Sequence, residues 1–471
     1  MLEINPHALP RNPPKALASL RVMRQPWIRA SIVLGLLFVG NCLALNWAIR
    51  PLARPGYQET TLDHVEDTLR FRPEGDDSWT PMRAALEAAE RPGKGTMYEQ
   101  VFFHQHKKFQ YPPSSLLIIE AIDGLTHGLT GDPNRPLHLI GWLSVWMLTL
   151  FSALIYDQVA QSQAAARGGA RGRPARIAEG VLVAALAFCF YPIDKGFTLG
   201  QIQLWINAGF AASLYAVWRG RETLGGINFG LACLIKPQYG IVMLWALVRR
   251  RFRFVLPCLA VAATGTAIAL WRYGADNLVD YLRVLAVLSH RGESFHPNFS
   301  VNGLLNRIVG MHEPRFNNVT WSSRYPPAPE WVFLATVVTS LVLVNLALLR
   351  ARRTDPLGRS ADFATATLVA TMASPIAWEH HYGILAPILA LLAGRLLHDP
   401  TARSSSRWLL LFAYLTTSNY FAFLLRLAPT PLNFLQSYLL FGALATLVIL
   451  LRLRNSAEAP RSGAVPAAGT T

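Results

Sequence analysis

The stretch RASIVLGLLFVGNCLALNWAI (residues 29–49) decides the class of fold, because no charged residue follows Arg29 until Arg50. An apolar helix of about 20 residues is long enough to cross a hydrocarbon core of about 30 Å. The run is too long for the core of a signal peptide, and no small-residue cleavage pattern follows it. Comparable apolar runs recur as far as residue 452. We therefore expect an all-α polytopic membrane protein in which residues 29–49 form the first span.

The composition supports this class and argues against nucleic-acid binding. Of the 471 residues, 52% are hydrophobic and only 15% are charged, whereas soluble proteins carry about 25% charged residues. The net charge of +16 comes largely from arginines in short linkers between apolar runs, as in 167–176, 249–253 and 350–353. Cytoplasmic loops of membrane proteins have this pattern, and no nucleic-acid motif accompanies it.

The placement of arginine predicts about 12 transmembrane helices, with both chain ends in the cytoplasm. We expect spans near 29–49, 137–159, 178–192, 198–218, 223–235, 238–249, 254–273, 330–350, 362–377, 382–397, 407–426 and 433–452. The segment 114–129 contains prolines and acids, and full insertion would place the arginine-rich 160–177 loop outside. We therefore expect 114–129 to enter the bilayer only partly or to lie along it.

This topology divides the chain into three parts. Residues 1–28 form a basic cytoplasmic tail, 29–452 a transmembrane catalytic domain and 453–471 a disordered cytoplasmic tail. Two long outer loops interrupt the domain, at 50–112 and 274–329, and the first carries amphipathic helices at about 59–70 and 79–90.

Two expected helices, 223–235 and 238–249, are too short to cross a membrane. Thirteen residues reach about 20 Å, and Lys236-Pro237-Gln238 joins the two helices. Broken helices at membrane depth are tolerated where they line a cavity. A buried lysine there costs a few kcal/mol unless it is compensated, so Lys236 is a candidate functional residue.

The first outer loop contains RFRPEGDDSWTPMRAALEAAERPGKGTMYEQVFFHQHKKFQYPP (residues 70–113). Asp76 and Asp77 precede a short helical pattern, Trp79 to Ala89. Two roles are open for this acidic pair. Asp77 caps the helix, as Asp often does, or one of the two carboxylates is a catalytic base.

The predicted topology gathers polar residues of several kinds on the outer face. These residues are Asp76, Asp77, Tyr111, Lys195, Gln201, Lys236, His296, Asn302, His380 and His381. Such a face suits an anionic, lipid-linked substrate, because lysines and histidines bind phosphate and a carboxylate deprotonates a hydroxyl. Two alternatives are structural: Lys195 is an interface anchor paired with Asp194, and Gln201 only bonds between helices.

We expect neither a metal nor another cofactor. His380 and His381 are adjacent and point in different directions on a helix, and no HxxxH or carboxylate spacing supports a closed metal site. The four cysteines lie inside or beside apolar runs without metal or redox spacing, which indicates packing residues. They are Cys42, Cys189, Cys233 and Cys258.

Several motifs, in this order, resemble those of glycosyltransferase family 87, membrane enzymes of the GT-C class. They are Asp77 before an Ala-rich helix, Tyr98, FQYPPSSLL (109–117), GQIQLWINAG (200–209), GLACLIKPQYG (230–240), NFSVNGLLNR (298–307) and SPIAWEHHYGIL (374–385). The resemblance runs from about residue 30 to 450. The chain departs from the family after the aspartate, where members often have an aromatic residue and this chain has Ser78.

The resemblance implies a GT-C-like helical bundle and an inverting glycosyltransferase in the bacterial inner membrane, with its active site facing the periplasm. The donor would be a polyprenyl-phosphate sugar, mannose or, in related members, arabinose, and the acceptor a lipid or glycan. By resemblance, Asp77 is the base, with Asp76 as the near alternative. His380 and His381 match the tandem histidine that contacts phosphate, and Lys236 matches the family's lysine before proline. The alternative function is a transporter or flippase for polyprenyl-linked lipids, which would show a repeat between its halves.

Overall fold

A computed structural model describes residues 26–53, 58–91, 95–126, 131–290, 296–309, 329–349, 351 and 353–456. Within these ranges all regular secondary-structure elements are helices. The only strand-like feature there is an isolated bridge between Asn298 and Trp378. The predicted all-α class is confirmed for this part of the chain. The expected tails, and residues 291–295 and 310–328 of the second outer loop, lie largely outside it.

The helices follow one another along the chain with short connections. The first half contains α2 (Pro26–Leu37), η1 (Phe38–Leu45), α3 (Asn46–Ile49), η2 (Arg50–Leu52), α4 (Thr61–Leu69), α5 (Trp79–Ala89), η3 (Glu99–His104), η4 (Pro113–Ser115), α6 (Leu116–Thr126), α7 (Arg135–Ala165), α8 (Arg173–Phe188), α9 (Tyr191–Thr198), α10 (Gln203–Trp218) and α11 (Glu222–Ile235). The second half contains η5 (Pro237–Tyr239), α12 (Gly240–Val248), α13 (Phe252–Tyr273), α14 (Ala275–Ser289), α15 (Val301–Val309), α16 (Glu330–Leu348), α17 (Pro356–Met372), η7 (Glu379–Ile384), α18 (Leu385–His398), α19 (Ser404–Thr417), η8 (Ala422–Leu427), η9 (Pro431–Ser437) and α20 (Tyr438–Asn455).

Six helical stretches of the described chain are long and apolar enough to cross a membrane. They are Ile28–Leu52, Arg135–Ala165, Phe252–Tyr273, Glu330–Leu348, Glu379–His398 and Pro431–Asn455. A seventh is possible if α8 and α9, which meet at a bend of 50°, form one broken span. The other expected spans correspond to α10, α11, α12, α17 and α19, which have between 9 and 17 residues.

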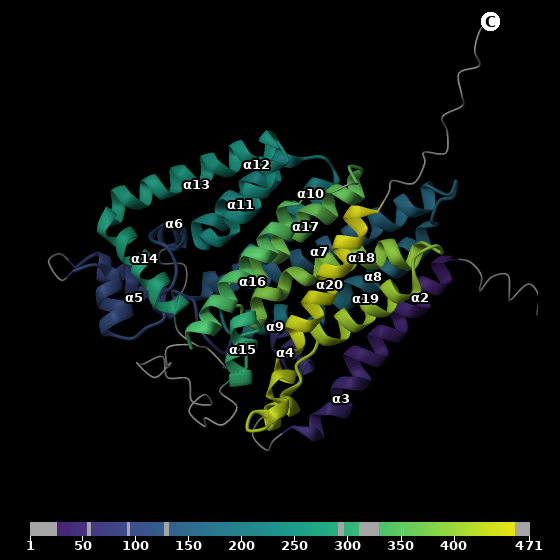
Figure 1. The fold of residues 1–471 in the computed structure, drawn as a ribbon, viewed down its shortest axis with the longest axis horizontal. Coiled ribbons are helices and arrows are strands. Elements are labelled where there is room, and N and C mark those ends of the chain that lie inside the picture. Colours follow the sequence, from purple (N-terminus) through teal and green to yellow (C-terminus); the bar gives the residue numbers. More distant parts are fainter. Residues whose placement is uncertain are drawn as a thin grey trace, which may run out of the picture.

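The helices differ strongly in burial, which separates the centre of the bundle from its rim. Most residues of α17 and α18 are buried. In contrast, α13 and α16 leave large apolar side chains such as Trp271 and Leu341 exposed. Exposed apolar faces of this kind are expected where helices contact lipid. Figure 1 shows the long helices running in broadly the same direction, with α5, α14 and α15 toward one end.

Two buried ion-pair clusters join helix ends that carry arginines. Asp362 of α17 accepts hydrogen bonds from Arg249 Nε at 2.8 Å and from Arg454 Nη1 at 2.9 Å. Glu179 of α8 accepts from Arg171 Nη2 at 2.6 Å. Truncating one partner of such a buried pair is strongly destabilising, by about 3–5 kcal/mol, because the other charge stays buried.

Helix α7 connects the Glu179 cluster to the predicted outer face, so its length gives the distance between them. His138, in its first turn, contacts Asp76 in the loop between α4 and α5 (residues 70–78, the acidic loop), whereas Tyr156 donates to Glu179 at 2.7 Å. The 18 residues from His138 to Tyr156 correspond to about 27 Å along one continuous helix. This length is close to the hydrocarbon thickness of about 30 Å, so the two polar layers are one membrane core apart.

The predicted first outer loop contains the helices that the sequence predicts. Helix α5 covers Trp79–Ala89, as expected, and α4 falls within the predicted 59–70 segment. Helix α6 has 11 residues, about 16 Å, which is too short to span a bilayer. Arg83 of α5 donates to both carboxylate oxygens of Asp123 on α6, at 2.9 and 3.1 Å, which fastens the loop to that helix.

Candidate functional site

The acidic stretch before α5 is attached through its backbone to the turn that follows α9. The Gly75 N–H donates to the Thr198 carbonyl at 2.9 Å. The Asp77 N–H donates to the Leu199 carbonyl at 3.0 Å. Gly200 makes this approach possible, because its φ is +64° and a Cβ at this position would overlap the Gly75 carbonyl oxygen. Only glycine adopts this conformation without a steric penalty.

Asp76 points to one side of this loop, toward α7. Its Oδ1 lies 2.8 Å from Nε2 of His138, which is buried. The ring of Trp79 meets the His138 ring edge-on, with centroids 6.4 Å apart. Asp76 is therefore held by a buried histidine that the sequence alone did not single out.

Asp77 points to the other side and remains exposed. Its Oδ2 accepts a hydrogen bond from Gln201 Nε2 at 3.2 Å. Although Asp77 is accessible at the surface, the groups packed around its carboxyl displace part of the surrounding water, and this partial desolvation raises its pKa above the ordinary value. The Gln201 bond and the charges of Lys195 and Lys108 oppose this rise. The alternative that Asp77 caps α5 is wrong for this structure, because Ser78 occupies the N-cap position.

The Ser78 hydroxyl forms several hydrogen bonds next to Asp77. Its hydroxyl oxygen accepts from the Ile202 N–H at 3.0 Å and lies 2.9 Å from the Tyr111 hydroxyl. It also donates to Gln201 Oε1 at 3.1 Å. Since a serine hydroxyl has one proton, Tyr111 must donate to Ser78. The carbonyl end of Gln201 then faces Ser78, and its amino group faces Asp77.

Tyr111 keeps the proton that this arrangement requires. Burial raises the pKa of the Tyr111 phenol to about 12. Its backbone carbonyl accepts from the Tyr98 hydroxyl at 2.6 Å, and the Tyr98 ring stacks on Phe109 with centroids 5.1 Å apart. The FQYPP segment is therefore packed in place beside the acidic loop.

A second group of site residues surrounds the break between α11 and α12. The Lys236 ammonium lies 2.5 Å from His381 Nε2. His381 Nδ1 lies 3.0 Å from the Trp378 N–H, which donates to it, and 3.1 Å from the Trp378 carbonyl, so the backbone of Trp378 fixes the ring that faces Lys236. Both side chains line a cavity of about 450 Å³, together with Gln110, Tyr281 and Ser374.

His380 is fixed from two sides. Its ring stacks on His381 with centroids 4.6 Å apart, and its backbone carbonyl accepts from Asn207 Nδ2 of α10 at 2.9 Å. A Cβ on Gly196 of α9 would lie 3.3 Å from the His380 Cβ, so α9 packs closely here. The tandem histidine therefore lies between the α9–α10 corner and the Lys236 break.

Two lysines place positive charge near the acidic loop. Lys195 is half-buried on α9, and its ammonium group forms neither a hydrogen bond nor an ion pair with the described residues. The predicted pairing of Lys195 with Asp194 is not observed there. Lys108, to which the sequence analysis gave no role, lies 4.1 Å above the Trp378 ring. Its charge also acts on Asp77, so Lys108 lies near both groups of site residues.

Asn302 and His296 have other contacts. The Asn302 amide donates to Thr336 on α16 at 3.3 Å and accepts from Asn306 at 2.8 Å. The His296 ring lies beside Tyr420, with centroids 6.0 Å apart. Burial and nearby positive charge lower the pKa of His296 to about 3, so its ring is neutral at physiological pH.

Sequence reasoning missed Ser78 and His138. Ser78 was noted only as a departure from the family's motif, and His138 lies in an apolar span far from the other motifs. His138 could have been identified from the sequence, because it is a titratable side chain inside an apolar run, and such residues are functional candidates by default.

Comparison with known proteins identifies the family to which the chain is similar. Residues 109–375, more than half of the chain, match the model of glycosyltransferase family 87. A polyprenol-phosphate-mannose-dependent alpha-(1-2)-phosphatidylinositol pentamannoside mannosyltransferase of Mycobacterium tuberculosis is 26% identical over 327 residues. The alignment covers 67% of this chain and 66% of that relative, slightly under two thirds of its length.

Two further relatives are similar. The protein of the same description from Mycolicibacterium smegmatis is 27% identical over 65% of this chain and 66% of its own length. A phosphatidylinositol mannoside mannosyltransferase of that species is 24% identical over 45% of this chain and 46% of its own. No solved structure matches the chain. From its motifs, its helical membrane fold and the extent of the family match, the chain belongs to glycosyltransferase family 87.

Proposed function

We propose that this protein transfers a sugar, mannose in the first instance, from a polyprenyl-phosphate donor to a hydroxyl of a lipid or glycan acceptor, with inversion. The donor class is supported by the relatives, whose descriptions are polyprenol-phosphate-mannose-dependent mannosyltransferases. The observation that carries the proposal is the position of Asp77. It is an exposed carboxylate held by Gln201, within the field of two lysines.

Asp77 acts as the general base. Gln201 binds Oδ2, so Oδ1 takes the proton of the acceptor hydroxyl. As that O–H bond breaks, the acceptor oxygen attacks the anomeric carbon of the donor sugar. The bond from this carbon to the phosphate oxygen breaks at the same time, and polyprenyl phosphate leaves with the electron pair. A phosphate leaving group needs little protonation, so one carboxylate suffices.

Positive and hydrogen-bonding groups stabilise the leaving phosphate. Lys236 and His381 line the 450 Å³ cavity, and His380 stacks on His381; these three residues would contact the phosphate. The charges of Lys195 and Lys108 act on Asp77 and add positive charge where negative charge develops. Tyr111 and Gln201 direct the base, and in this proposal His296 and, on α15, Asn302 are further substrate-binding residues.

The site faces the periplasm in this proposal. Asp77 and the arginine clusters lie at opposite ends of α7, and arginine-rich loops face the cytoplasm. The shorter helices α10, α11, α12, α17 and α19 complete a GT-C-like bundle of about 12 transmembrane helices. We assign residues 29–452 to this catalytic domain; α20 continues past this boundary to Asn455.

One assay tests the function directly. Purified protein in nanodiscs is given radiolabelled polyprenyl-phosphate mannose and a panel of phosphatidylinositol mannosides and glycans. We expect label in a new glycolipid or glycan, with the anomeric configuration inverted. Parallel reactions with polyprenyl-phosphate arabinose define the sugar. Movement of the donor across a sealed bilayer without transfer would instead support the flippase alternative.

A further inference from the structure

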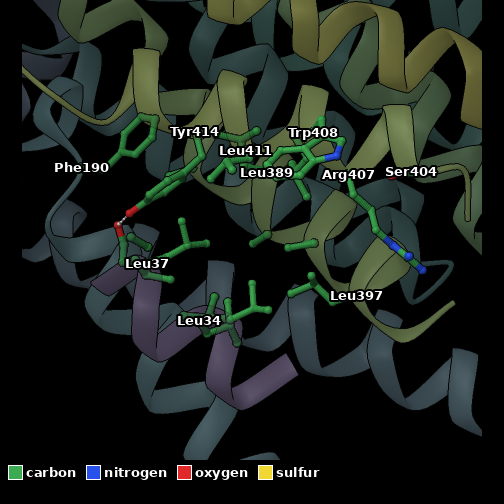
Figure 2. Close-up of a pocket in the computed structure, with 18 residues that line it drawn as sticks. Leu34, Leu37, Phe190, Leu389, Leu397, Ser404, Arg407, Trp408, Leu411 and Tyr414 are labelled. Atoms are coloured by element: carbon green, nitrogen blue, oxygen red, sulfur yellow. Dashed lines mark hydrogen bonds between the residues drawn. The ribbon is translucent and has the colours of Figure 1, made fainter. Parts of the chain in front are cut away.

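A second, apolar cavity lies away from the residues described above. It has a volume of about 320 Å³ and lies between α2, α8, α18 and α19. Almost all of the side chains that line it are aliphatic or aromatic, for example Leu34, Leu389 and Leu411. Figure 2 shows these side chains around the cavity, with Tyr414 and Phe190 at one end and Arg407 and Ser404 at the other.

The Tyr414 end of this cavity is closed by polar contacts between η1 and the end of α19. The Tyr414 hydroxyl donates to the Leu186 carbonyl at 3.2 Å. Beyond it, the buried Asn41 donates to Ser418 at 3.1 Å and accepts from Asn419 at 2.7 Å. These buried amides join the two elements, so the cavity does not continue toward the acidic loop on that side.

The other end carries the cavity's charge. Arg407 Nε donates to the Leu396 carbonyl at 3.2 Å, and its Nη2 donates to the Asp399 carbonyl at 2.5 Å. Its Nη1 has no hydrogen-bond partner among the described residues. Together with the Ser404 hydroxyl, this group offers donors to an anion at the end of an otherwise apolar groove.

The length of the groove fits one leaflet of a bilayer. Ser404 and Tyr414 are ten residues apart on α19, about 15 Å along the helix. This is half of a hydrocarbon core of about 30 Å. Trp408, which also lines the cavity, is 69% exposed and so faces outward from the bundle. The groove is therefore accessible from the membrane and extends from the arginine end to mid-bilayer.

We propose that this groove binds one acyl chain of an anionic glycerophospholipid from the cytoplasmic leaflet, with its phosphate at Arg407. The positive residue at the mouth selects an anionic headgroup, and the closed end sets the chain depth. A polyprenyl-phosphate donor does not fit this description, because its phosphate must reach Lys236 and His381. The bound lipid is a partner additional to the donor and acceptor. Its leaflet and its distinction from the donor rest on the orientation and donor site proposed above, whereas its binding does not require transfer activity.

Photolabelling tests this site. The full chain is placed in phosphatidylcholine nanodiscs with a small fraction of phosphatidylglycerol that carries a diazirine at the end of one acyl chain. We expect saturable labelling of peptides containing Leu389 or Leu411, competed by unlabelled phosphatidylglycerol more strongly than by phosphatidylcholine. Ala393→Phe, which fills the groove, should reduce this labelling at least about fivefold, and Leu341→Phe on the lipid face of α16 should not change it.

Arg407→Gln provides an independent variant that keeps the cavity volume. It should remove the preference for phosphatidylglycerol and leave labelling by the phosphatidylcholine analogue. Labelling spread evenly over the lipid-facing helices, or equal competition by both phospholipids in the unmodified protein, would overturn the proposal. So would competition by polyprenyl phosphate alone, because the groove would then hold the donor chain.

Discussion

Asp76 and Asp77 are adjacent in the chain, yet they have different partners. Asp76 binds the buried His138 at 2.8 Å, whereas Asp77 is exposed and binds Gln201 at 3.2 Å. A carboxylate that is already bound to a buried ring is less available to a substrate than one with a free oxygen. The two residues are therefore expected to differ in their contribution to transfer.

Removal of the Asp77 charge should abolish transfer without unfolding the protein. Asp77→Asn keeps the hydrogen-bonding shape but cannot accept the proton, so we expect a loss of about 10²–10⁴-fold in kcat, as is typical for general bases. Asp76→Asn should lose less, because it affects only the support of the loop. Donor transfer assays on both purified variants, with thermal unfolding as a folding check, measure this. Full activity in Asp77→Asn contradicts the assignment.

The hydrogen bond from Gln201 should set the pH dependence of the reaction. This bond favours the charged form of Asp77 and lowers its pKa, so Gln201→Leu should raise that pKa. Transfer requires the carboxylate, and activity is lost as pH falls through the pKa. The acidic limb of kcat/KM should therefore move to higher pH, by up to about one unit. A merely structural role for Gln201 would lower activity and leave this limb in place.

At the scale of elements, the corner between α9 and α10 holds the acidic loop. Gly200 has a φ of +64° at this corner, with the Gly75 carbonyl directly against its Cα. Gly209, in the middle of α10, has open space where a Cβ would lie. The two glycines thus provide a matched pair, one constrained by its backbone and one not.

Gly200→Ala should destabilise the loop and reduce transfer. The left-handed conformation costs a residue with a Cβ about 1–2 kcal/mol, and the overlap with Gly75 adds to this cost. Gly209→Ala should be neutral or slightly stabilising, since alanine favours helices by up to about 1 kcal/mol. Thermal unfolding in detergent and transfer assays compare the two. Equal behaviour of both variants would contradict the proposed constraint at Gly200.

The sequence predicted the positions of helices better than it predicted which side chains contact one another. Helix α5 and the break at Lys236 follow from local signals, namely a helical pattern after Asp77 and a proline after a short apolar helix. For Lys236 and His381 the sequence predicted only that both lie on the outer face, not that they contact each other. The Ser78–Gln201 bond joins residues 123 positions apart. Such contacts depend on how α9 and α10 pack against the loop. This packing cannot be predicted from a local sequence pattern.

On the scale of the whole molecule, the acidic loop and the arginine clusters lie at opposite ends of α7. This arrangement predicts opposite accessibility for two exposed positions, Glu87 on α5 and Arg221 before α11. In a chain whose four cysteines are replaced, Glu87→Cys should react with a membrane-impermeant maleimide in intact cells. Arg221→Cys should react only after the membrane is permeabilised. The reverse pattern would invert the proposed topology.

The single unbroken helix α7 also has a consequence for the lipids around the enzyme. A continuous helix does not shorten, so the two polar layers that it connects remain about 27 Å apart. A bilayer of different thickness must stretch, thin or force the bundle to tilt, at fractions of a kcal/mol per Å of mismatch. Transfer should therefore be fastest in membranes whose acyl-chain length matches this spacing, and the enzyme would sort toward such membranes in the cell.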